Sequence, residues 1–249
     1  MVLITNAIVF NAIVFACVGI ALALFGGGGA MILIPYLKQG LGFPVDQAAL
    51  LSLITIGTNT GIQTVHDRRI IAWKPVLLFS LVSFPIASLS GQFLAPITSD
   101  TLRMMLFGIF TLSVALMMLF RKNKEAADTT INLAGLGFAA ITTGIICGLV
   151  GVGGGIFITP ALIMFYGLSI KEAIRSSLAI VALQSVAALG AYLNRGVSID
   201  PSFLILTMAT IAIGFSVGKR IKQGLPDQKL KQWFSVFLLV VGTWVLIRP

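Results

Sequence analysis

Charge is scarce in this chain of 249 residues. Only 10% of the residues are charged, against about 25% in a typical soluble domain, whereas 57% are hydrophobic and the mean hydropathy is +1.03. No hydrophilic stretch is long enough for a second domain, and no basic run precedes the first apolar stretch as in a cleaved signal peptide. A helix that crosses a bilayer needs about 20 apolar residues. The sequence therefore predicts a multi-pass integral membrane protein and excludes a soluble enzyme with one hydrophobic anchor.

Reactive side chains are equally few. The chain has one histidine, His66, and two cysteines, Cys17 and Cys147, which lie inside apolar runs, where a small hydrophobic residue is expected rather than a disulfide framework. The acidic residues all fall in expected loops or at segment ends: Asp46, Asp67, Asp100, Glu125, Asp128, Glu172, Asp200 and Asp227. The pattern offers no carboxylate pair, no His-Glu-x-x-His motif and no buried acid for a proton or sodium relay. We therefore expect neither an enzyme nor a metal or cofactor site.

What the chain does contain is an internal repeat with an offset of 125 residues. The run Gly26-Gly27-Gly28-Gly29 matches Gly151-Val152-Gly153-Gly154-Gly155. A proline follows each cluster, Pro35 in the first copy and Pro160 in the second. Chance does not easily supply both features in one register, so we infer two copies of one unit.

The apolar segments divide in the same way. In each half an apolar arm precedes the glycine cluster, and a short apolar segment and three longer ones follow it. This order predicts a first membrane repeat over residues 1–120, a linker over 121–130 and a second membrane repeat over 131–249.

The short segments, Met31 to Leu41 and Ile156 to Gly167, bear on orientation. As helices they cover about 18 Å, too little for a hydrocarbon core of about 30 Å. The opening of each unit is therefore either one broken crossing or a re-entrant hairpin. Lysine and arginine divide eight to nine between the two sides for a broken crossing, but thirteen to four for a hairpin.

The positive-inside rule favours the uneven division. We therefore predict an all-α integral membrane protein with two inverted-topology repeats, each a broken, re-entrant helical hairpin plus three transmembrane helices. Both termini are expected outside the cytoplasm, in the cell (cytoplasmic) membrane. The excess positive charge then lies at the cytoplasmic lipid surface, which argues against nucleic-acid binding.

The glycine clusters are the first candidate site. Glycine in a helix interior costs about 1 kcal/mol, so such a cluster ends a regular helix. In inverted repeats the helices that start after the two breaks point their N-termini, which attract anions, at a shared point. Close helix packing is the alternative, whereas a P-loop is excluded because its lysine is missing. The expected site residues are Gly26, Gly27, Gly28, Gly29, Pro35, Gly151, Gly153, Gly154, Gly155 and Pro160.

Two glycine-rich motifs followed by proline, each opening one half of an apolar chain, resemble the sulfite exporter TauE/SafE family. The Ser-Leu steps at Ser52 and Ser177 and the connection from His66 to Trp73 are also similar. The first copy departs from the pattern, with Ala30 at the position of Gly155. The resemblance covers nearly the whole chain. It implies export or uptake of small anions such as sulfite or organosulfonates across the cytoplasmic membrane, and we expect export.

Polar side chains inside the apolar segments extend the candidate site. Amides and hydroxyls at membrane depth suit oxyanion binding, although hydrogen bonds between helices are an equal alternative. The serines either bond to their own helix or face the glycine break, and the repeat favours the second reading. The residues expected at the site are Ser52, Asn59, Gln63, Ser177, Gln184 and Ser185.

Two charged positions are weighed separately. Arg175 lies just inside its helix, where a side chain that snorkels to the interface is favoured over an anion ligand, and its repeat counterpart is Leu50. His66 lies beside Asp67 and Arg68, as a surface histidine does, and proton sensing is the less favoured reading.

Three functions remain open at this point. The first is an alternating-access carrier for small anions, the second an anion channel, and the third a structural or partner subunit whose glycines only pack. The expected partners are a small anion and the lipid bilayer, and the pattern leaves the oligomeric state open.

Overall fold

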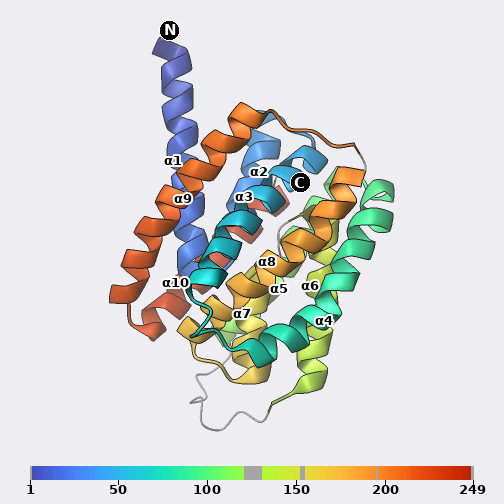
Figure 1. Cartoon of the computed structure of the whole chain (residues 1–249), viewed down its shortest axis with the longest axis vertical. Coiled ribbons are helices and arrows are strands. Elements are labelled where there is room, and N and C mark those ends of the chain that lie inside the picture. Colours follow the sequence, from blue (N-terminus) through green and yellow to red (C-terminus); the bar gives the residue numbers. More distant parts are fainter. Residues whose placement is uncertain (1, 121–130, 152–154, 195, 248–249) are drawn as a thin grey trace.

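The computed structural model describes residues 2–120, 131–151, 155–194 and 196–247 (Figure 1). The first half forms α1 (Val2–Phe25), α2 (Gly29–Pro35), α3 (Val45–His66), α4 (Trp73–Leu89) and α5 (Asp100–Phe120). The second half forms α6 (Leu133–Val150), α7 (Gly155–Ala161), α8 (Ile170–Asn194), α9 (Pro201–Gly224) and α10 (Asp227–Ile247). Helices and no strands occur in these ranges, so the predicted all-α class is confirmed.

Shorter helical segments complete both halves. A π-helical turn follows each short helix, η1 (Tyr36–Gly40) after α2 and η5 (Leu162–Tyr166) after α7. A third π segment, η2 (Ser90–Leu94), and a 3-10 turn, η3 (Ala95–Ile97), extend α4.

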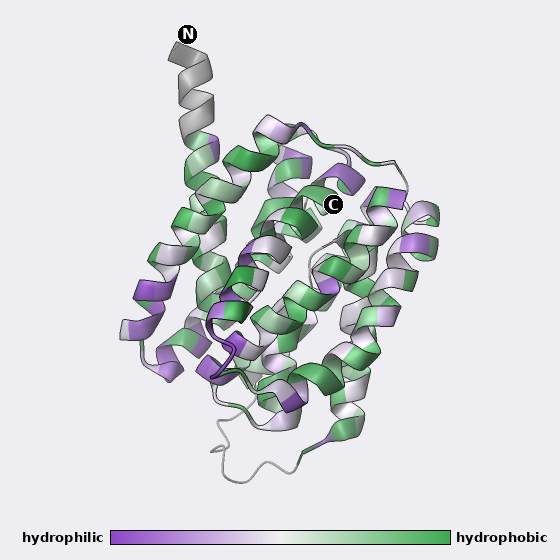
Figure 2. Ribbon diagram, viewed as in Figure 1, coloured by the Kyte–Doolittle hydropathy of each residue, from purple (hydrophilic) through white to green (hydrophobic). Residues whose placement is uncertain are grey.

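Six helices in the described part of the chain are long and apolar enough to cross a membrane. They correspond to α4 with its extension, α5, α6, α8, α9 and α10. Their outer surfaces carry large apolar side chains, such as Leu81, which is 78% exposed. Figure 2 shows hydrophobic residues along most helices and hydrophilic residues where α9 ends and α10 begins. This distribution is typical of a multi-pass membrane protein, because lipid rather than water covers the sides of the bundle.

Each short helix doubles back along the long helix that precedes it. In the first half the Tyr36 hydroxyl donates a hydrogen bond to Asn11 Oδ1 at 2.5 Å. In the second half the backbone N–H of Asn132, just before α6, donates to the carbonyl of Phe165 at 2.8 Å. Both openings are therefore hairpins rather than single broken crossings.

The backbone turns of the two halves coincide in register. Gly26 and Gly151 have φ of +73° and +76°, and Gly42 and Gly167 have φ of +73° and +80°. Both pairs keep the offset of 125 residues that the sequence shows. Glycine is the residue that adopts this left-handed conformation without strain, which explains its place at these four turns.

The two halves intertwine. The first helix of each half packs against the fourth helix of the other half, α1 on α9 and α6 on α4. Helices α3 and α8 pack on each other at the centre, and the Ala72 N–H after α3 donates to Ser176 Oγ near the start of α8. In Figure 1, α1 and α3 run downward whereas α6 and α8 run upward. This arrangement brings the two glycine breaks to the middle of the bundle.

Candidate functional site

The two glycine breaks contact each other directly. A Cβ atom on Gly27 would lie 2.2 Å from Gly155 Cα, and one on Gly155 would lie 2.4 Å from the Gly26 carbonyl oxygen. Side chains are therefore excluded from both positions in this conformation. The sequence-predicted residues Gly26, Gly27 and Gly155 come together, whereas Gly153 and Gly154 lie outside the described residues.

Hydroxyl groups tie the first break to the second half. Ser177 Oγ on α8 lies 2.9 Å from the carbonyl oxygen of Gly26 and 2.9 Å from that of Ile174 on its own helix. The Thr159 hydroxyl on α7 lies 2.9 Å from Ser177 Oγ and 3.2 Å from the Phe25 carbonyl oxygen. Ser177 thus faces the break, as the repeat predicts, and also bonds back to its own helix. Thr159 was not predicted, because its repeat counterpart is Ile34.

The second break meets α3 in the corresponding way, but without the hydrogen bond. A Cβ on Gly151 would lie 2.4 Å from Ala49 Cβ, which places this turn of α3 against the break. Ser52, three residues further on, is 1% exposed, and its hydroxyl has no hydrogen-bond partner among the described residues. In both halves a glycine break therefore packs against the long helix of the other half, but the serine bonds to the break in only one of the two described contacts.

The α8 face that meets the first break continues to an unpaired amide. A Cβ on Gly155 would lie 2.5 Å from Val181 Cγ2, and Gln184 follows Ser177 by two turns on this face. Gln184 is fully buried, and neither its oxygen nor its nitrogen has a partner in the described part of the structure. The buried Ser185 hydroxyl is also unpaired and lies beside Gly57 of α3. Each unpaired buried polar group destabilises the folded protein by about 1–3 kcal/mol, so these side chains lower its stability when no ligand is bound.

Asn59 and Gln63 both have hydrogen-bond partners within the protein. Asn59 Nδ2 donates to the Thr55 carbonyl of its own helix at 2.8 Å. Gln63 lies at the end of α3, where its Nε2 donates to Asp67 Oδ2 and its Oε1 lies 3.5 Å from Lys219 Nζ. The structure therefore separates Gln63 from the breaks.

The remaining predicted residues support the hairpins rather than the contact between the breaks. A Cβ on Gly28 would meet Phe237 of α10, and one on Gly29 would lie 2.8 Å from the Val18 carbonyl oxygen of α1. Pro35 is buried within α2, and Pro160 lines a space of about 20 Å³ beside Met118. These positions pack closely, which is the alternative that the sequence left open for the glycine clusters.

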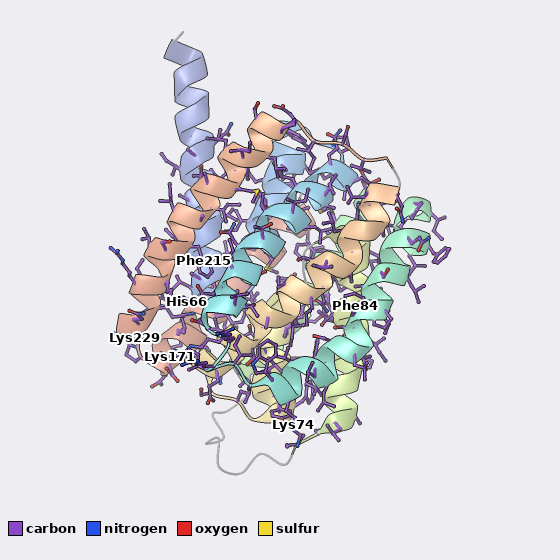
Figure 3. All side chains as sticks on the ribbon, viewed as in Figure 1. His66, Lys74, Phe84, Lys171, Phe215 and Lys229 are labelled. Atoms are coloured by element: carbon purple, nitrogen blue, oxygen red, sulfur yellow. The ribbon has the colours of Figure 1, made fainter. Side chains whose placement is uncertain are left out.

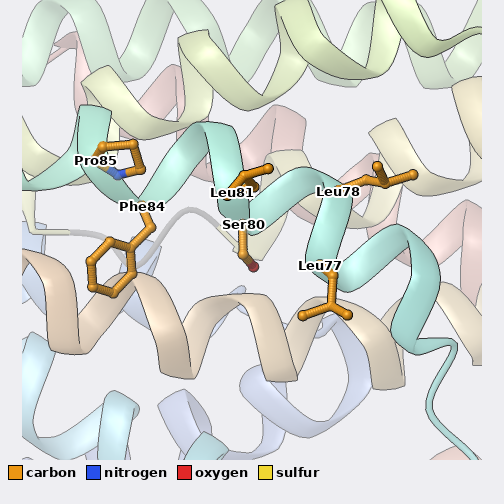
Figure 4. A pocket seen from close by; sticks show the side chains of 6 residues that line it. All are labelled: Leu77, Leu78, Ser80, Leu81, Phe84 and Pro85. Carbon is orange, nitrogen blue, oxygen red and sulfur yellow. The ribbon is translucent and has the colours of Figure 1, made fainter.

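A larger groove, of about 480 Å³, runs along the lipid-facing side of α4 (Figure 4). Its lining residues are Leu77, Leu78, Ser80, Leu81, Phe84 and Pro85. The Ser80 side chain points from α4 toward a neighbouring helix, and its hydroxyl has no partner among the residues described. The groove is otherwise apolar, which suits lipid chains rather than a small anion.

The charged residues lie at the ends of the bundle. His66, Lys74, Lys171 and Lys229 gather at the lower end in Figure 3. His66 is 69% exposed and lies 3.9 Å from Asp67, as expected for a surface histidine. No group of three or more potential metal-ligating residues occurs in the described ranges.

Comparisons with known proteins give the family. Residues 11–245 match the family model described as sulfite exporter TauE/SafE. The chain is 29% identical to a probable membrane transporter protein of Methanocaldococcus jannaschii, with 92% of each chain covered. It is 27% identical to a probable membrane transporter protein of Haemophilus influenzae, with 95% of this chain and 97% of the relative covered. Since the match spans nearly the whole chain and the fold is that of a multi-pass membrane protein, the chain belongs to the sulfite exporter TauE/SafE family of membrane transporters.

Proposed function

We propose that this transporter carries small oxyanions, such as sulfite or organosulfonates, out of the cell by alternating access around the paired glycine breaks. The family name supports the substrate class, and the positive-inside rule supports a cytoplasmic location for the basic end of the bundle. One repeat would move against the other around the contact between Gly27 and Gly155.

The observation that carries this proposal is the buried, unpaired carboxamide of Gln184. Close packing explains why glycines stand at the breaks, but it gives no reason for an unpaired amide on the same α8 face. The Gln184 NH₂ group and the Ser52 and Ser185 hydroxyls are neutral donors, which suit an anion that must leave again. A bound oxyanion would accept the hydrogen bonds that these groups lack here.

The hydrogen bonds between the breaks set part of the free energy that is needed to separate them. Among the residues that the structure describes, hydrogen bonds across the contact run from Ser177 to the Gly26 carbonyl and from Thr159 to the Phe25 carbonyl. Each such bond contributes about 0.5–1.5 kcal/mol net. An oxyanion that binds the Gln184 amide and the Ser52 and Ser185 hydroxyls after the breaks separate would offset this loss. In this mechanism the conformation described here is closed at its centre, and substrate binding favours its opening.

Replacing Gln184 by leucine tests the proposal. We expect sulfite flux into proteoliposomes to fall by about tenfold or more, as the loss of about 1.4 kcal/mol of binding implies. Thermal stability should stay equal or rise, because the substitution removes an unpaired buried amide. Gln232→Leu on the exposed face of α10 is the matched control and should transport as the wild type does.

The same liposomes separate the alternatives. A carrier saturates with sulfite and shows counterflow, a channel passes current without exchange, and a partner subunit moves nothing by itself. Unchanged sulfite flux in the Gln184→Leu variant would exclude this residue from the substrate site.

A further inference from the structure

A second buried hydroxyl on α8 bonds to the helix that leads into the other glycine break. The Tyr192 hydroxyl lies 3.0 Å from the carbonyl oxygen of Gly148 and 3.2 Å from that of Leu149, so its single hydrogen is shared between them. Both carbonyls belong to the last turn of α6, where a helix offers no donor of its own. Tyr192 is fully buried and supplies that donor. Helix α8 is therefore bonded to the second break as well as to the first.

The two contacts lie on opposite sides of Gln184. Ser177 precedes Gln184 by seven residues and Tyr192 follows it by eight, which is about 10 Å and about 12 Å along the helix. Ser177 lies toward the end of the bundle where α8 begins and where Figure 3 shows Lys171. Tyr192 lies toward the opposite end, two residues before α8 ends. The candidate substrate amide therefore has one hydroxyl contact to a break on each side.

The Tyr192 contact is not a feature of the repeated frame. The counterpart of Tyr192 in the first half is Asp67, which follows the last residue of α3 and accepts a hydrogen bond from Gln63. Helix α6 packs closely on α4 but only sparsely on α8. The link between the end of α6 and α8 therefore depends strongly on the Tyr192 side chain.

We propose that Tyr192 is a positioning residue for transport, which holds the second break closed on the side of the membrane opposite the basic end. This inference rests on the proposed function, because alternating access needs a separate closure on each side of the substrate. When α6 and α8 separate, the Gly148 and Leu149 carbonyls lose their donor. Water in the opened passage replaces it, as polar backbone at membrane depth requires. The bond from Ser177 to the Gly26 carbonyl is the corresponding closure on the basic side.

The chain carries its own reporter for this closure. Cys147 directly precedes Gly148, is fully buried and belongs to one buried cluster with Tyr192. Cys17, the other cysteine, is exposed on α1, so Cys17→Ser leaves Cys147 as the single thiol of the chain. Opening between α6 and α8 should expose Cys147 to water. Sulfonatoethyl methanethiosulfonate, a thiol reagent that does not cross membranes, then reaches Cys147 only from the side that opens.

Tyr192→Phe in the Cys17→Ser parent tests the proposal, because it removes the hydroxyl and keeps the ring. In right-side-out membrane vesicles we expect the reagent to label Cys147 about three to ten times faster than in the parent, as the loss of one hydrogen bond implies. In inside-out vesicles the labelling rate should equal that of the parent. Tyr36→Phe removes the hydroxyl that bonds to Asn11 in the first hairpin and is the matched control, which should label as the parent does. Equal rates from outside in Tyr192→Phe and the parent would overturn the proposal.

A purely structural role for the hydroxyl predicts another pattern. Tyr192→Phe would then raise labelling equally from both sides and lower the unfolding temperature in detergent, and this result also overturns the proposal. Ser177→Ala is the second variant, because it weakens the closure on the basic side. We expect it to leave the labelling of Cys147 from outside no faster than in the parent. A rise as large as that in Tyr192→Phe would mean that the two contacts do not close separate sides.

Sulfite flux in the same vesicles separates this inference from the proposed function. If the parent carries sulfite and Tyr192→Phe leaves the labelling of Cys147 unchanged, Tyr192 is not a closure and the transport proposal stands. If the parent carries no sulfite but Tyr192→Phe speeds labelling from outside alone, Tyr192 closes this side of the protein and the proposed substrate is wrong.

Discussion

The two ends of the bundle carry corresponding ion pairs with the charges exchanged. At one end Asp46, at the start of α3, binds Arg103, at the start of α5, with an N–O distance of 2.7 Å. At the other end Lys171, the repeat counterpart of Asp46 at the start of α8, binds Asp227, at the start of α10, at 3.2 Å. Both pairs therefore join the third helix of a half to its last helix.

The surroundings of the two pairs differ. The Arg103 side chain is only 4% exposed, its Nε donates to the Thr98 carbonyl at 3.1 Å and its second amino group to that of Ala95. The side chains of Lys171 and Asp227 are 36% and 49% exposed. The two halves thus place an ion pair between the same two helices. We expect the buried pair to stabilise the fold and the exposed pair to contribute little.

Replacing Arg103 should lower the stability of the protein more than any other substitution at these two ion pairs. Arg103→Met removes a buried guanidinium group together with its ion pair to Asp46 and its hydrogen bonds to two backbone carbonyls, and breaking a buried ion pair costs about 3–5 kcal/mol. We expect a clear fall in the thermal unfolding temperature of the purified protein in detergent. Arg69→Met, at an exposed position, is the control and should unfold as the wild type does. Equal unfolding temperatures for all three proteins would mean that the buried pair contributes nothing.

The serines at the two glycine breaks also differ between the halves, and we expect a smaller effect on stability from replacing them. Ser177 bonds to the Gly26 carbonyl, whereas its repeat counterpart Ser52 has no partner among the described residues. Ser177→Ala should lose about 1 kcal/mol of stability, and Ser52→Ala should lose none or become more stable. Chemical unfolding of the two variants measures the difference directly. If Ser52→Ala destabilises as much as Ser177→Ala, the hydroxyls are equivalent and the asymmetry between the halves is wrong.

Sequence reasoning reached the parts of the fold that follow from local pattern. Hydropathy predicted the helical segments, and the short length of the segments after the glycine clusters, together with the distribution of charge, predicted the hairpins. It also placed Gly26, Gly155 and Ser177 in one candidate site, and the structure brings these three residues together.

Contacts between residues far apart in the sequence could not be predicted from local patterns. The contact between Arg103 and Asp46 spans 57 residues, and no local pattern in the sequence indicates it. Gln63 shares a face with Asn59, but it follows Ser52 by eleven residues, or about 16 Å along a helix, which carries it to the end of the bundle. Periodicity indicates the face of a helix, whereas depth along the axis depends on where the helix starts.

The exposed ion pair should give the smallest effect and so completes the comparison. Lys171→Ala removes the contact with Asp227, but water screens both charges, and exposed pairs contribute about 0–1 kcal/mol. We expect an unfolding temperature close to that of the wild type at low salt and no difference at high salt, because screening already weakens the pair. A loss as large as that of Arg103→Met would mean that this end of the bundle is held as tightly as the other. Burial would then not explain the difference between the two ends.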